Sequence, residues 1–111
     1  MNVNVESLND FKIVSLEGRL ETTNASEFEK SIMEIIEGGC AILILDCTGL
    51  NYISSSGLRV FLVIQKKMMA VKGQFRLCSL QPTIREIFDI SGFSVIFKLF
   101  PDQEAAMKNS L

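Results

Sequence analysis

The sequence contains one decisive stretch, Ala41-Ile42-Leu43-Ile44-Leu45, a continuous apolar run that ends at Asp46. An apolar run of this length after the pair Gly38-Gly39 is typical of a strand buried on both faces. Such strands lie in the middle of parallel sheets flanked by helices, and the loops at their carboxyl ends face ligands. The run therefore predicts an α/β domain, with Asp46 and the segment after it at its functional edge.

Before this run, the apolar spacing predicts two strands and a helix. Strands near 3–5 and 11–16 alternate apolar and polar residues, as half-buried members of a hairpin do. Asn24 and Glu27 resemble a capping box at the start of an amphipathic helix. That helix is expected to end at Gly38-Gly39.

After the run, strands and helices continue to alternate, which implies crossover connections and a mostly parallel sheet. The predicted ranges are a loop at 47–54, a helix at 58–69, a strand at 75–80, a helix from Pro82 to Gly92, a strand at 95–97 and a short helix from Pro101. The helix after Pro82 is expected to turn inward Ile84, Ile87, Phe88 and Ile90. The whole chain, 1–111, is predicted to form one α/β domain. It would hold a mixed sheet of about five strands, an N-terminal hairpin and about four helices.

The composition excludes several classes of function. The chain has 111 residues, 48% of them hydrophobic and 22% charged, with a net charge of −2, so it lacks the basic footprint of a nucleic-acid binder. No apolar run is long enough to cross a membrane, and the N-terminus does not resemble a signal peptide, so a cytoplasmic protein is expected. Three cysteines, Cys40, Cys47 and Cys78, without a C-x-x-C pair predict buried thiols rather than disulfides or a zinc site.

Catalytic chemistry is also restricted. The chain has no histidine, which removes Ser-His-Asp and Cys-His catalysis and the commonest metal ligand. It contains no G-x-S-x-G, no Ser-x-x-Lys near the serines and no P-loop. We therefore expect a protein that is not an enzyme and that carries neither a metal nor a cofactor. Asp46 is open to two interpretations, a cap of a turn or a ligand of a phosphate-linked metal.

The segment Ser54-Ser55-Ser56-Gly57-Leu58 stands between the predicted central strand and an apolar helix. One interpretation is that a serine caps the helix, because a hydroxyl oxygen can accept a hydrogen bond from a free N–H group of the first turn. The other is a phosphorylation site, because a helix N-terminus favours a phosphate. Gly57 would let another molecule's backbone approach closely.

Three stretches of the sequence point to a known family. The segment from Asp46 to Val60 resembles the signature of STAS domains, specifically the SpoIIAA-like anti-sigma factor antagonists. The stretch from Val14 to Glu21 resembles the exit of that family's first hairpin, and Leu80-Gln81-Pro82 and Phe100-Pro101-Asp102 are also similar. The resemblance covers nearly the whole chain, and the predicted order of elements agrees with the STAS fold.

The resemblance implies a partner switch. Its partner would be an anti-sigma factor with an ATPase-type serine kinase fold, which binds the unphosphorylated antagonist and phosphorylates it on a serine. The phosphorylated form is released, a serine phosphatase restores it, and sigma-dependent transcription changes indirectly. By position the acceptor is Ser55, with Ser54 and Ser56 as alternatives. The partner surface implied by the resemblance consists of Glu21, Thr22, Ser54, Ser55, Ser56, Gly57, Leu58 and Arg59. Ser54 and Glu21 stand where the family often has aspartate.

Two alternatives remain open at the level of the sequence. The chain could be a STAS-type module that senses a nucleotide or a lipid, or serves as a scaffold, without phosphorylation. The helix at 58–69 is more apolar than a surface helix requires, so Val60, Ile64 and Met68 could be buried or could form a docking patch. For the oligomeric state, a monomer is the simplest expectation.

Overall fold

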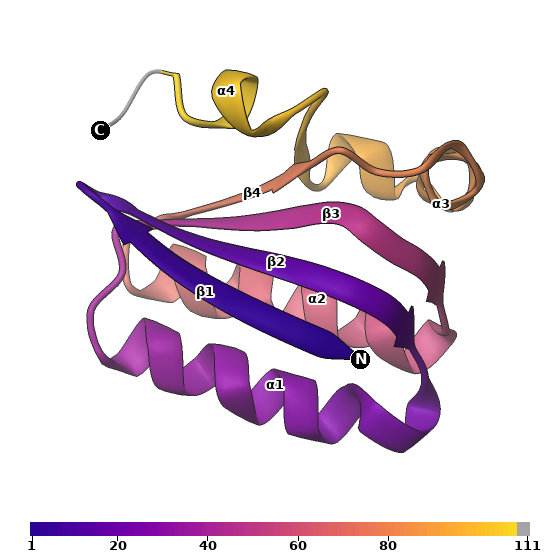
Figure 1. Ribbon diagram of the computed structural model, residues 1–111, viewed down its shortest axis with the longest axis horizontal. Coiled ribbons are helices and arrows are strands. Elements are labelled where there is room, and N and C mark those ends of the chain that lie inside the picture. The colour runs from indigo at the N-terminus through magenta and orange to yellow at the C-terminus, as the bar shows by residue number, and fades with distance from the viewer. Residues whose placement is uncertain (109–111) are drawn as a thin grey trace.

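The computed structural model describes residues 1–108, which form a five-stranded sheet with helices on both faces (Figure 1). The strands are β1 Asn2–Leu8, β2 Phe11–Leu20, β3 Ile42–Ile53, β4 Gln74–Cys78 and β5 Lys98–Phe100. The helices are α1 Thr22–Glu37, α2 Ser55–Ala70, α3 Pro82–Ile90 and α4 Gln103–Ala106, and a short 3-10 helix, η1, spans Phe93–Val95.

The strands follow the chain in space, in the order β1-β2-β3-β4-β5. β1 and β2 are antiparallel, and every later pair is parallel. The mixed, mostly parallel sheet with an N-terminal hairpin is therefore confirmed. Parallel neighbours bring the carboxyl ends of β2, β3 and β4 to one side of the sheet, where α1, α2 and α3 begin.

The main core lies between the sheet and α1 and α2, which run along one face (Figure 1). At its centre the ring of Phe61 lies 6.2–6.4 Å from the rings of Phe28, Phe75, Phe88 and Phe97. A smaller cluster on the opposite face is covered by α4 and consists of Phe11, Ile13, Ile42, Ile44, Cys78 and Ala106. Val60, Ile64 and Met68 are at most 1% exposed, so they are core residues and not a docking patch.

A buried arginine connects α4 to the sheet. Arg76 of β4 is 4% exposed, and its Nη1 donates to the carbonyl oxygens of Ala106 at 2.6 Å and Lys108 at 3.0 Å. Ala106 is the last residue of α4 and Lys108 lies two residues beyond it, where no later amide of the helix can reach their carbonyls. The guanidinium therefore satisfies the end of a helix that is too short to be stable alone.

Two predicted boundaries before and at the start of α2 were wrong. The range 47–54 is not a loop, because β3 continues to Ile53 with Cys47, Leu50 and Ile53 buried. The ten-residue β2 supplies the partner for this extension, out to the pair Leu20↔Ile53. α2 begins at Ser55, three residues before the predicted start at 58.

The last strand was also misplaced. Gly92 adopts a positive φ of 79°, and the chain then makes the 3-10 turn where a strand was predicted at 95–97. Val95 is 90% exposed, whereas Phe97 is buried as a member of the ring cluster around Phe61. Pairing with β4 begins only after Phe97, at Arg76↔Lys98.

Three predictions about burial and capping were wrong as well. β1 is exposed along its whole length instead of half-buried. In α3 only Ile84 and Phe88 face the core, and Ile87 and Ile90 are exposed, because the nine-residue helix packs through one narrow stripe. α1 begins three residues early, with Glu21 as its N-cap and the Asn24 side chain accepting from the Glu21 amide at 2.8 Å.

Candidate functional site

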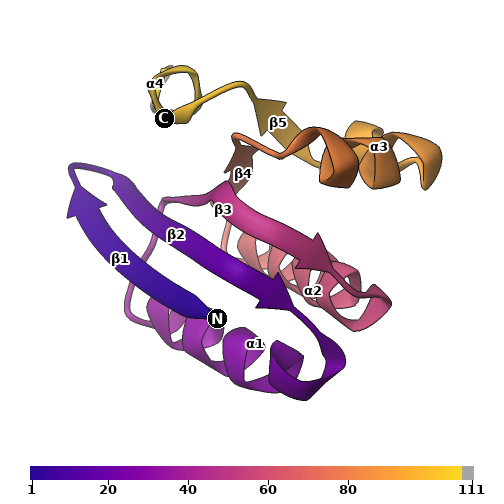
Figure 2. The same cartoon turned by 45° about the vertical axis from the view of Figure 1, so that its right-hand side comes forward.

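The N-termini of α1 and α2 lie next to each other at the carboxyl ends of β2 and β3 (Figure 2). The Ser54 amide donates to the carbonyl oxygen of Leu20 at 2.9 Å, which continues the β2–β3 pairing to the first residue of the serine segment. The hydroxyls of Thr22 and Ser56 lie 3.2 Å apart and join the first turns of the two helices. The sheet therefore brings Glu21 and Thr22 together with Ser54–Ser56. At the hydroxyl contact, Thr22 and Ser56 are 34 residues apart in the sequence.

The three serines have different environments. The Ser54 side chain caps α2 by accepting from the Gly57 amide at 3.1 Å. Ser56 is half-buried and held by Thr22. Ser55 is exposed at the first position of the helix, and within residues 1–108 its hydroxyl makes no hydrogen bond. The capping interpretation thus holds for Ser54, and Ser55 is left as the accessible hydroxyl.

Gly57 is buried, not exposed as a contact point for another backbone. A Cβ at this position would lie 2.8 Å from Cγ of Leu20 and 2.9 Å from Cγ1 of Ile53. Contacts this close would force α2 away from the ends of β2 and β3. The glycine therefore sets how closely the serine segment sits against the sheet, while Leu58 is half-buried and Arg59 is exposed beside it.

Two further residues form the rim of this site and were not predicted from the sequence. The Arg19 guanidinium lies 4.1 Å from the centroid of the Tyr52 ring and 3.3 Å from Oε1 of Glu21. Arg19 and Tyr52 are neighbours across β2 and β3. The missing signal was the length of β3, since Tyr52 fell in a predicted loop and had no assigned neighbour.

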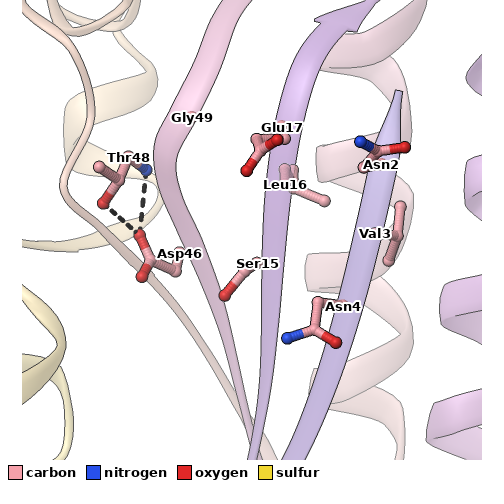
Figure 3. Close-up of a pocket in the computed structure, with 9 residues that line it drawn as sticks. All are labelled: Asn2, Val3, Asn4, Ser15, Leu16, Glu17, Asp46, Thr48 and Gly49. Carbon is pink, nitrogen blue, oxygen red and sulfur yellow. Dashed lines mark hydrogen bonds between the residues drawn. The ribbon is translucent and has the colours of Figure 1, made fainter.

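Asp46 belongs to a different feature, a hollow on the face of the sheet opposite α1 and α2 (Figure 3). Its Oδ1 accepts from the amide of Thr48 at 3.0 Å and from the Thr48 hydroxyl at 2.6 Å, and its Oδ2 accepts from Gln103 at 2.6 Å. Asp46 thus bonds locally to Thr48 inside β3, where the β2–β3 register shifts, and not at a turn. Residues 1–108 contain no group of three or more Cys, Asp or Glu side chains that could hold a metal ion.

The hollow has a volume of about 290 Å³ and is lined by polar groups of β1, β2 and β3. Its charged residues are Glu17 and Asp46, and Asn2, Asn4, Ser15 and Thr48 supply the other polar side chains. No lysine or arginine lines it. This lining is unfavourable for anionic ligands, because two carboxylates face the space with no opposing cation.

Asp46 gives a prediction about pH. Partial burial raises the pKa of this carboxyl, but the hydrogen bonds from the Thr48 hydroxyl, the Thr48 amide and Gln103 outweigh it and hold the pKa below its usual range. A lowered pKa stabilises the folded state at neutral pH, and this contribution is lost as the pH falls through the folded-state value. Asp46→Asn should therefore lower the unfolding free energy at pH 7 by about 1–2 kcal/mol.

The measurement is urea unfolding at pH 7 and at about pH 3, below the usual aspartate pKa. The difference in unfolding free energy between wild type and Asp46→Asn should be smaller at the acidic pH than at pH 7. Asp10→Asn, in the exposed turn between β1 and β2, is the matched control and should change little at either pH. An equal loss for Asp46→Asn at both pH values would contradict the role of its charge.

The thiols offer little nucleophilic chemistry. Cys47 and Cys78 are buried, Cys40 is half-buried, and all three are free, as predicted. Burial raises the pKa of Cys78 to about 11 and raises the pKa of Cys47 well above its usual range. The thiolate form is therefore scarce at neutral pH.

Among residues 1–108 no helix has the length and apolar character needed to cross a membrane.

The STAS domain family matches residues 2–106. Over 106 residues the chain is 37% identical to BtrV, a candidate anti-sigma factor antagonist of Bordetella bronchiseptica, covering 96% of this chain and 91% of BtrV.

Solved structures agree with the fold. The crystal structure of a candidate anti-sigma factor antagonist from Thermotoga maritima matches with a TM-score of 0.91 at 21% identity, over 96% of this chain and 92% of that one. Unphosphorylated SpoIIAA, an anti-sigma factor antagonist, matches with a TM-score of 0.81 at 23% identity, over 96% of this chain and 93% of that one. Fold, family match and sequence identity agree, and the chain therefore belongs to the STAS domain family, in which its relatives are named anti-sigma factor antagonists.

Proposed function

We propose that this protein is an anti-sigma factor antagonist that binds its partner when unphosphorylated and is released when Ser55 is phosphorylated. The partner is an anti-sigma factor with an ATPase-type serine kinase fold, and a serine phosphatase restores the binding form. The contact surface is formed by Glu21, Thr22, Ser54, Ser55, Ser56, Leu58 and Arg59, while the buried Gly57 positions this segment against the sheet. The protein acts in the cytoplasm without touching nucleic acid. The observation that carries the proposal is the exposed Ser55 hydroxyl between two serines whose hydroxyls are engaged.

The position of Ser55 suits a reversible phosphate. At the start of α2 the amides of the first turn and the positive end of the helix dipole favour an anion, so the modification need not unfold the helix. The group adds about −1.5 to −2 charges to an exposed surface, which changes what a partner meets. SpoIIAA, whose fold this chain shares, has been solved in unphosphorylated and phosphorylated forms, which is consistent with such a switch on this fold.

The two departures from the family pattern fit the local geometry. Ser54 replaces a frequent aspartate, and serine and aspartate are comparably good N-caps. Its oxygen makes the capping bond to Gly57. Glu21 caps α1 and pairs with Arg19, so its carboxylate remains at the rim of the surface. The helix cap at Ser54 and the carboxylate at Glu21 are therefore both kept despite the replacements.

Phosphorylation can be tested directly. The protein is incubated with ATP and a purified anti-sigma factor that has a serine kinase fold and comes from the same organism, and the phosphate is located by mass spectrometry. We expect one phosphate, on Ser55, and none on Ser55→Ala. Ser54→Ala is the matched control. It loses a helix cap, with a stability cost of about 1 kcal/mol, but should still be phosphorylated. Modification of Ser56 instead, or no modification by this kinase, would contradict the proposal.

A ligand-sensing role without phosphorylation has less support. The hollow near Asp46 is one polar recess that a small ligand could use, but it carries two carboxylates and no cation. A nucleotide phosphate or an anionic lipid headgroup would meet repulsion there. Calorimetric titration with ATP, GTP or vesicles containing phosphatidylserine should show no binding.

A further inference from the structure

The two edges of the sheet differ in their protection against pairing with another strand. β5 has three residues, one of them Lys98, and Pro101 follows it. β1 has seven residues, pairs with β2 without a bulge from Asn2↔Glu17 to Leu8↔Phe11, and contains neither lysine nor proline. Within residues 1–108 no strand pairs with the outer edge of β1. This edge presents a row of backbone N–H and C=O groups that match another extended strand.

The side chains of β1 add an apolar row to this edge. Val3 and Val5 pair with Leu16 and Val14 of β2, which belong to the main core on the α1 side of the sheet. The two valines extend that row outward but remain 39% and 48% exposed. A strand added beside β1 would continue the sheet and cover them. The opposite face of β1 carries Asn2, Asn4, the exposed Leu8 and the single charged residue of the strand, Glu6.

In place of the monomer expected from the sequence, we propose that β1 pairs antiparallel with β1 of a second copy of this chain, which joins the two sheets across a two-fold axis. The strand is complementary to itself in this orientation. An axis at Asn4 places Val3 opposite Val5 of the second copy, and Asn2 opposite Glu6 of the second copy. An axis at Glu6 would place two carboxylates opposite each other, which is unfavourable. The position of Glu6 therefore disfavours the register centred on it, whereas the register centred on Asn4 pairs the two exposed valines across the axis and keeps the carboxylates apart.

The proposed dimer leaves the serine segment outside the new contact. β1 is the edge strand, β2 separates it from β3, and Ser54–Arg59 follow β3 at the carboxyl end of the sheet. The pairing uses the backbone and side chains of β1 alone. Each dimer would then present two serine segments. This inference does not depend on the proposed phosphorylation.

The first test measures self-association by sedimentation equilibrium over a wide concentration range. Wild type should dimerise as the concentration rises. The double variant Val3→Lys/Val5→Lys places like charges opposite each other and should weaken dimerisation at least ~10-fold. Met69→Lys/Val71→Lys makes the same chemical change at exposed residues around the end of α2 and should dimerise like wild type. Circular dichroism checks that both variants are folded.

The second test maps the register by disulfide trapping in a Cys40→Ser background. Directly opposite residues of an antiparallel pair have Cα atoms about 4.5–5.5 Å apart, within disulfide range. Asn4→Cys should therefore form a covalent dimer under mild oxidation, and Met69→Cys should not. A monomer at every concentration, or trapping of Asn4→Cys no greater than that of Met69→Cys, would overturn the proposal. Amide protection of β1 that requires the anti-sigma factor would assign the edge to that protein and overturn it too.

Discussion

Replacing Phe61 with alanine is expected to lower the free energy of unfolding by about 3–5 kcal/mol, a large share of the ~5–15 kcal/mol that stabilises a typical domain. Phe61 is fully buried, and its ring contacts the rings of Phe28, Phe75, Phe88 and Phe97. These four rings come from α1, β4, α3 and the segment after η1. Truncation at their common neighbour leaves a cavity that no single element can close.

Urea or thermal unfolding checks this value, with two comparison variants. Phe61→Leu keeps much of the volume and should lose less than Phe61→Ala. Met69→Ala lies on the same helix but its side chain is 66% exposed, so its effect should stay within ~0.5 kcal/mol. A loss below about 1 kcal/mol for Phe61→Ala would mean that the ring cluster does not connect the elements as the structure describes.

The parallel part of the fold was predictable because its signals are local and strong. The apolar run 42–45 indicates a buried strand, and the alternation of strands with helices indicates crossovers. These features place the serine segment at the carboxyl end of the sheet without any knowledge of side-chain contacts. The mixed sheet and the family resemblance are both confirmed by the structure and the comparisons.

The errors fall where a residue's environment depends on a distant partner. Val3 and Val5 have the alternation of a half-buried strand, but burial needs a layer over that strand, and no sequence pattern shows whether one exists. Tyr52 was assigned to a loop because the extension of β3 depends on the length of β2. Gly57 is expected from the sequence to be a contact point, but the side chain of Leu20, 37 residues away, and that of the nearby Ile53 leave no room for a Cβ there.

At the serine segment, the sequence predicted which residues matter better than it predicted their individual roles. Three adjacent hydroxyls were equally possible caps or acceptors by chemistry alone. The structure separates them through one local contact, Ser54 with the first turn of its own helix, and one contact across the fold, Ser56 with Thr22 of α1. The choice of Ser55 as acceptor stays a prediction, now with a structural reason for preferring it.

Ser55→Asp is expected to weaken binding to the anti-sigma factor at least ~10-fold, equal to about 1.4 kcal/mol, whereas Ser55→Ala should bind like the unphosphorylated protein. Ser55 is the first residue of α2, where a carboxylate is favourable, so the variant should fold normally. The loss would come from a charge buried without a partner in the interface, at a point where the serine hydroxyl is neutral.

Thr83→Asp provides the matched control for this charge. Thr83 is exposed in the first turn of α3, so the substitution adds the same charge at another helix N-terminus outside the proposed surface. Calorimetry with the purified anti-sigma factor should show wild-type affinity for Thr83→Asp and weakened affinity for Ser55→Asp. Equal affinity of Ser55→Asp and Ser55→Ala would refute a switch at this serine. Only a local contact can distinguish two helix starts that carry the same added charge. An equal loss of affinity in Thr83→Asp and Ser55→Asp would therefore show that net charge, and not the local surface of α1 and α2, controls release.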